Sequence, residues 1–66
     1  MIDTKKLKGV IVEQGKTQEN VARAIGMSPR TFSYKMKKGV FGSDEIEAMI
    51  EYLKIEQPLT IFFVSE

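Results

Sequence analysis

The chain has 66 residues, which suits one domain near the lower size limit for a hydrophobic core. It contains neither Cys nor His, so disulfides and the usual zinc sites are excluded and the fold must depend on apolar packing. The net charge is only +1, but residues 16–39 carry six Lys or Arg and one acidic residue, whereas residues 40–66 carry one Lys and six acidic residues. This separation predicts a basic segment that faces a polyanion.

The apolar residues argue against a membrane or secreted protein. The longest apolar stretch, residues 61–64, is far shorter than the roughly 18 residues of a membrane span. The N-terminus is charged from Asp3 to Lys8 and lacks the apolar region of a signal peptide. We therefore expect a cytoplasmic protein with no membrane partner.

Helical spacing of apolar residues predicts a first helix over residues 4–14, with Asp3 or Thr4 as its N-cap. Thr17 is a good N-cap for a second helix, and Gly26 is expected to end it.

A third helix is predicted from Pro29 to Lys38. Ser28 is a preferred N-cap residue, and proline suits the first helical position because no backbone N–H is needed there. The connection from the second helix comprises only residues 26–28, which forces the two helices to cross steeply. Ala22 leaves room for this close approach, and Met27 supplies an apolar contact in the turn.

The C-terminal third predicts one further helix and an apolar segment. Ser43 is expected to cap a helix over residues 43–54, and Phe41 in the preceding connector is expected to enter the core. Pro58 can start a fifth helix or a turn. The segment 59–64 is too apolar to be a free tail, so either it folds back to close the core or part of it forms a dimer contact.

The third helix separates an apolar side from a basic side. At about 100° per residue, Phe32 and Met36 share one face, while Arg30, Tyr34 and Lys37 point away from it. Arginine can pair bidentately with guanine in the major groove, which is about 12 Å wide and admits one helix. Nearly every outward residue can hydrogen-bond a base edge or a phosphate, including the flanking Thr31, Ser33, Lys35 and Lys38.

The stretch T-Q-E-N-V-A-R-A-I-G-M-S-P-R-T-F-S, residues 17–33, resembles the helix-turn-helix motif of the Cro and cI-type phage repressors. In that resemblance Gln18 matches a phosphate-contacting glutamine, Gly26 the turn glycine and Phe32 a buried apolar residue. Arg30 and Tyr34 match base-reading positions, with Ser28, Pro29 and Ser33 beside them. The pattern of the later helices extends the resemblance over the whole chain.

Two residues depart from the pattern of that family. Lys35 stands where a second buried aliphatic residue is usual, and Met36 is expected to take that role. Pro29 replaces a polar reader and cannot donate a hydrogen bond, so base reading is expected to begin at Arg30.

The resemblance implies an all-α, lambda-repressor-like domain of four to five helices that regulates transcription in a prokaryotic cell or a phage-infected host. Its partners would be double-stranded DNA and a second copy, since one small domain offers little contact for tight binding. The expected base readers are Arg30, Tyr34, Ser33, Ser28 and Pro29. The expected phosphate contacts are Thr17, Gln18, Thr31, Lys35, Lys37 and Lys38.

Other functions have less support in the sequence. Without His or Cys, catalysis would fall to carboxylates on the solvated face of the fourth helix, so we expect neither enzyme activity nor a metal or cofactor. The alternative function is a protein-interaction module on the same fold, a modulator or antirepressor that binds a phage repressor. The apolar segment 59–64 favours that alternative, and Arg30 on an open basic face argues against it.

Overall fold

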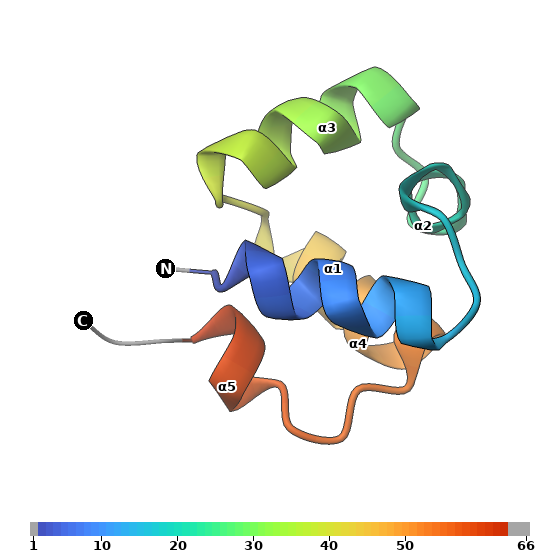
Figure 1. Ribbon diagram of the computed structural model, residues 1–66. Coiled ribbons are helices and arrows are strands. Elements are labelled where there is room, and N and C mark those ends of the chain that lie inside the picture. Colours follow the sequence, from blue (N-terminus) through green and yellow to red (C-terminus); the bar gives the residue numbers. More distant parts are fainter. Residues whose placement is uncertain (1, 64–66) are drawn as a thin grey trace.

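The computed structural model describes residues 2–63, and within that range the chain forms five α-helices and no β-strand (Figure 1). The all-α prediction is therefore confirmed. No helix of this range is both long enough and apolar enough to cross a membrane. The helices are α1 Thr4–Glu13, α2 Gln18–Ala24, α3 Pro29–Lys38, α4 Ser43–Leu53 and α5 Leu59–Phe62.

The first three helices begin at the capping side chains that the sequence predicts. The Asp3 carboxylate caps α1. Thr17 Oγ1 accepts the backbone N–H of Asn20 at 3.0 Å, and Asn20 Oδ1 accepts the Thr17 N–H at 3.0 Å. Ser28 Oγ accepts the backbone N–H of Thr31 at 3.2 Å. These bonds satisfy donors that have no partner within their own helix, so local sequence alone delimits the starts of α2 and α3.

The prediction that Ser43 caps the fourth helix is wrong. Gly42 holds the N-cap position: its carbonyl accepts the Ile46 N–H at 2.9 Å, and Ser43 is already helical. The Glu45 carboxylate reaches back and accepts the Gly42 N–H at 2.8 Å. The carboxylate of the third helical residue therefore satisfies the N–H of the N-cap residue, while Gly42 has no side chain that could accept an N–H of the first turn in return.

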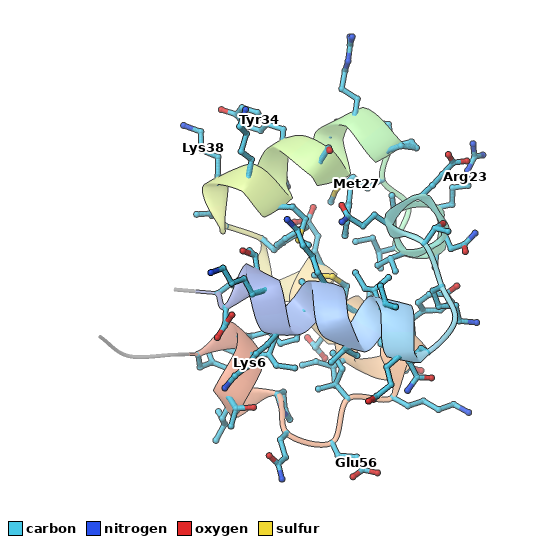
Figure 2. All side chains as sticks on the ribbon, in the orientation of Figure 1. Lys6, Arg23, Met27, Tyr34, Lys38 and Glu56 are labelled. Atoms are coloured by element: carbon cyan, nitrogen blue, oxygen red, sulfur yellow. The ribbon has the colours of Figure 1, made fainter. Side chains whose placement is uncertain are left out.

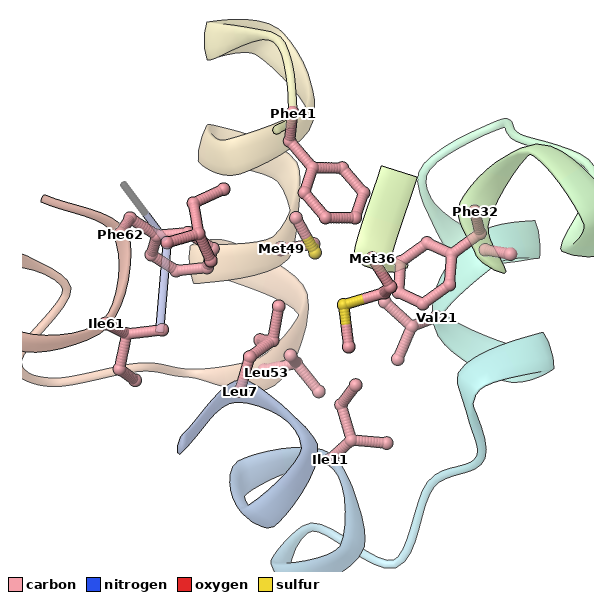
Figure 3. Close-up of a cluster of buried hydrophobic side chains, with 12 residues drawn as sticks. Leu7, Ile11, Val21, Phe32, Met36, Phe41, Met49, Leu53, Ile61 and Phe62 are labelled. Atoms are coloured by element: carbon pink, nitrogen blue, oxygen red, sulfur yellow. The ribbon is translucent and has the colours of Figure 1, made fainter. Parts of the chain in front are cut away.

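All five helices and their flanks contribute apolar side chains to one core (Figure 3). The rings of Phe32 and Phe41 lie 5.3 Å apart between centroids in a tilted arrangement, which aromatic pairs favour. Phe41 thus enters the core as predicted, and Met36 is buried as well. Among the described residues no polar or charged side chain is buried. The core consists of Ile2, Leu7, Ile11, Val21, Ala22, Phe32, Met36, Phe41, Met49, Leu53, Ile61 and Phe62.

The C-terminal segment folds back onto the start of the chain. Ile61 and Phe62 are buried, and the Ile61 carbonyl accepts the backbone N–H of Asp3 at 2.7 Å. Core closure, one of the two predicted roles, is confirmed for this part of the segment. Leu59 and Phe63 are 70% and 58% exposed, so they do not take part in that closure. Val64 lies outside the described residues.

Gly9 lies in the middle of α1, where a β-carbon would meet nothing within 4 Å. Gly9→Ala should raise the free energy of unfolding by about 0.5–1 kcal/mol, because alanine restricts the unfolded chain and suits a helix interior. Urea denaturation followed by circular dichroism measures this change. As a control, Gly39→Ala should lower stability by about 1–3 kcal/mol, since Gly39 ends α3 at φ +72°. A lower midpoint for Gly9→Ala would contradict the placement of residue 9 in an open helix face.

Candidate nucleic-acid interface

The helices α2 and α3 form a steeply crossed pair. In Figure 1, α2 is seen almost along its axis while α3 runs across the view. α3 packs chiefly against α2, where Ala22 is completely buried and Met27 is half-buried against the core. The backbone N–H of Met27 donates to the Ala22 carbonyl at 2.9 Å. Ala22 and Met27 are thus shielded from water where the two helices meet, which fits the roles that we expect of them.

The helix α3 is divided into a buried side and an exposed side. Phe32 and Met36 are 1% and 4% exposed, and they anchor α3 to the core. The rest of the helix lies at the edge of the molecule, where Tyr34 and Lys38 extend away from the other helices (Figure 2). α3 contains no acidic residue. Its exposed side carries Pro29, Arg30, Thr31, Ser33, Tyr34, Lys37 and Lys38.

The exposed cations on this side differ in their contacts. The Lys38 ammonium lies 5.6 Å from the centroid of the Tyr34 ring, one helical turn away, which holds a positive charge beside an exposed phenol. Arg30 is exposed and forms no ion pair within residues 2–63. Arg23 on α2, by contrast, pairs with Glu19 at 3.1 Å. Arg30 is therefore the arginine whose charge remains available to a ligand.

The hydroxyl groups at the two helix starts are already partly used. Thr17 Oγ1 caps α2, and Ser28 Oγ both accepts the Thr31 N–H and donates to Thr31 Oγ1 at 2.9 Å. Gln18 is the first residue of α2 and is half-buried. These side chains retain free acceptor or donor capacity, because each hydroxyl oxygen has two lone pairs and the Gln18 amide caps neither helix.

Lys35 differs from the other lysines of α3. Its ammonium donates to both carboxylate oxygens of Glu45, at 2.9 and 2.8 Å, and the two side chains are only 33% and 24% exposed. The hydrogen bond from Lys35 and that from the Gly42 N–H lower the pKa of the Glu45 carboxyl below its ordinary value of 4.5. The expectation that Lys35 contacts a phosphate did not foresee its pairing with Glu45. One signal could have indicated an ion pair: Lys35 stands at a position where the motif has a buried residue, and a half-buried lysine needs an acidic partner.

A groove of about 690 Å³ lies away from α3, between α1 and the segment that joins α4 to α5. Its floor is apolar, with Val10, Leu53 and Ile61, and Lys6 and Glu56 lie on its walls. Within residues 2–63 no three Asp or Glu side chains gather as metal ligands would. All the residues that line this groove come from α1 and its C-cap, the end of α4, the following connector and α5, so it shares no residue with the exposed side of α3.

The family described as "Protein of unknown function (DUF739)" matches residues 1–66, so the chain belongs to this family. No curated protein and no solved structure matches the chain. The description of the family names no activity, and the function is therefore argued from the residues.

The ion pair between Lys35 and Glu45 predicts a pH-dependent stability. The folded-state pKa of Glu45 is lowered, so its contribution is complete above about pH 4.5, its ordinary value, and is lost as the pH falls through the folded-state pKa. At pH 7, Glu45→Gln should lower the free energy of unfolding by up to about 1 kcal/mol, and the difference from the native chain should shrink in acid.

Urea denaturation at several pH values between 7 and 3 measures this difference. Glu47→Gln is the matched control, because Glu47 is an exposed carboxylate of the same helix. A loss for Glu45→Gln that stays constant over this pH range would show that the ion pair does not stabilise the fold.

Proposed function

We propose that this member of the DUF739 family is a sequence-specific DNA-binding regulator of transcription, similar to the Cro and cI-type phage repressors. In this proposal α2 and α3 are the two helices of a helix-turn-helix, in a lambda-repressor-like domain that works in the cytoplasm of a prokaryotic cell or a phage-infected host. The observation that carries the proposal is the exposed side of α3, which is basic and rich in hydroxyl groups, contains no acidic residue and is fixed to the core by Phe32 and Met36.

The dimensions of α3 suit the major groove. Ten residues at 1.5 Å per residue give a helix about 15 Å long, and a groove about 12 Å wide accepts one helix. Arg30 is near the start of α3, where the recognition helix of such proteins approaches the base edges. Its free guanidinium can donate two hydrogen bonds to one guanine. Tyr34, one turn later, can pack on a thymine methyl group or bond a phosphate.

The remaining roles follow from position and chemistry. Base reading is assigned to Arg30, Tyr34 and Ser33, with Ser28 and Pro29 beside them at the start of α3. Phosphate contacts are assigned to Thr17, Gln18, Thr31, Lys37 and Lys38, which hold the domain in register on the backbone. Lys35 is left out of this set because its ammonium is bonded to Glu45.

The regulator is proposed to act as a two-fold dimer on a pseudo-palindromic site. One domain of this size buries too little surface for tight specific binding, and two copies would place their α3 helices about 34 Å apart, one turn of DNA. Leu59 and Phe63 are the exposed apolar residues of the C-terminal segment and, with α4, the candidates for this contact.

A second candidate function is a protein-interaction module that binds and modulates a phage repressor. The exposure of Leu59 and Phe63 favours it, because a monomer leaves these side chains in water. Such a module would bind DNA weakly and without sequence preference, but it would form a tight complex with its protein partner.

Arg30→Ala should weaken binding to the preferred duplex by about 1–3 kcal/mol and relax the preference at one base pair, because the bidentate contact with guanine is lost. Fluorescence anisotropy with the preferred duplex and its single-base variants measures both effects. Arg23→Ala removes an equal charge from α2 and should leave the base preference unchanged. An equal loss on every duplex for Arg30→Ala would reduce Arg30 to a phosphate contact.

Lys38→Ala should weaken binding to all sequences alike and reduce the slope of log K against log salt by about one, as expected when one phosphate contact is lost. The affinities are measured from 50 to about 300 mM salt, a range wide enough to define the slope. Lys6→Ala is the control, since Lys6 lies on α1, on the side of the molecule away from α3 (Figure 2). An unchanged slope for Lys38→Ala would remove Lys38 from the interface.

A further inference from the structure

Two ion pairs occur within residues 2–63, and they have different structural consequences. Arg23 and Glu19 belong to the same helix and are mostly exposed. Lys35 and Glu45 join α3 to α4 and are both largely shielded from water. Only the second pair can influence how one helix is oriented relative to another.

The Glu45 carboxylate accepts hydrogen bonds from both α3 and the start of α4. It accepts two hydrogen bonds from the Lys35 ammonium, and its Oε1 also accepts the Gly42 N–H at 2.8 Å. Gly42 is the N-cap of α4, so the carboxylate is fixed to the backbone at the start of that helix. Through Glu45, the last part of α3 is thus connected to a fixed point on α4.

This connection restricts the rotation of α3 about its own axis. Phe32 and Met36 hold one face of α3 against the core, and Lys35 lies about 100° from Tyr34 around the helix. Apolar contacts have no preferred direction of their own. The two hydrogen bonds of the Lys35 ammonium do have one, so they add an angular restraint on the flank of the helix to that of the packed core.

We propose that Lys35 and Glu45 form a positioning pair, which fixes the rotation of α3 and thereby the direction in which Arg30 and Tyr34 meet the base edges. Lys35 itself does not contact DNA. This inference rests on the proposed DNA-binding function and adds a residue pair that determines specificity without touching the nucleic acid.

The test uses Lys35→Met combined with Glu45→Gln, because this double variant removes the pair without changing the net charge. Glutamine retains an acceptor for the Gly42 N–H, and methionine retains the apolar stem. The ratio of affinities for preferred and scrambled duplexes should fall about tenfold, since a misaligned base contact is lost. The salt slope should not change.

Lys35→Arg is the conservative rescue variant. Arginine can bond both oxygens of Glu45, so this variant should keep the affinity ratio of the native chain. Spectra of the ¹H–¹⁵N amide signals without DNA provide a second readout at a temperature at which every variant is folded. The double variant should shift the amide signals of α3, including those of Arg30 and Tyr34, and Lys35→Arg should restore them.

The outcomes separate the inference from the function on which it rests. A double variant with the native affinity ratio would overturn the positioning pair while DNA recognition stands. A salt slope reduced by about one, with equal losses on both duplexes, would overturn it by making Lys35 a phosphate contact. A native chain that does not distinguish the two duplexes would overturn the proposed function, and the inference with it.

Discussion

Much of this architecture follows from the packing of α3 across α2. A chain of this length without cysteine must obtain its stability from apolar burial, and α3 contributes Phe32 and Met36 to that burial. Ala22 on α2 is small and completely buried, so its side chain leaves room for a neighbouring helix. Because the buried apolar residues of α3 lie on one face, the opposite face is polar and basic. The same contact therefore stabilises the fold and creates the surface that we propose for DNA.

A recognition surface also needs a fixed orientation, and here the polar contacts complement the core. Ser28 fixes where α3 begins, Gly39 fixes where it ends, and Lys35 with Glu45 connects it to α4. A side chain that contacts a base binds more tightly when it is already ordered in the free protein. Ordering it only on binding costs conformational entropy and weakens the affinity. We infer that the core stabilises the fold, whereas the contacts of Ser28, Gly39 and Lys35 orient Arg30.

The sequence predicted those features that depend on neighbouring residues. The starts of α2 and α3 follow from Thr17 and Ser28, and the buried side of α3 follows from the spacing of apolar residues. The pair of Lys35 and Glu45 was not predictable in this way, because ten residues and a non-helical connector separate the partners. The N-cap of α4 was misassigned for a different reason: Gly42 has no side chain that marks it as a cap, whereas the neighbouring Ser43 is a preferred N-cap residue. The return of the C-terminal segment to the start of the chain became evident only from the burial of Ile61 and its hydrogen bond with Asp3.

The most direct test of the central claim is a selection of bound duplexes from a random DNA pool by the purified chain at near-physiological salt. The affinity for the selected sequence is then compared with that for scrambled DNA. We expect an enriched, two-fold symmetric site that binds at least ~10³-fold more tightly than scrambled DNA. Recovery of no common sequence, with equal and weak binding to all duplexes, would contradict it and would favour the protein-interaction module.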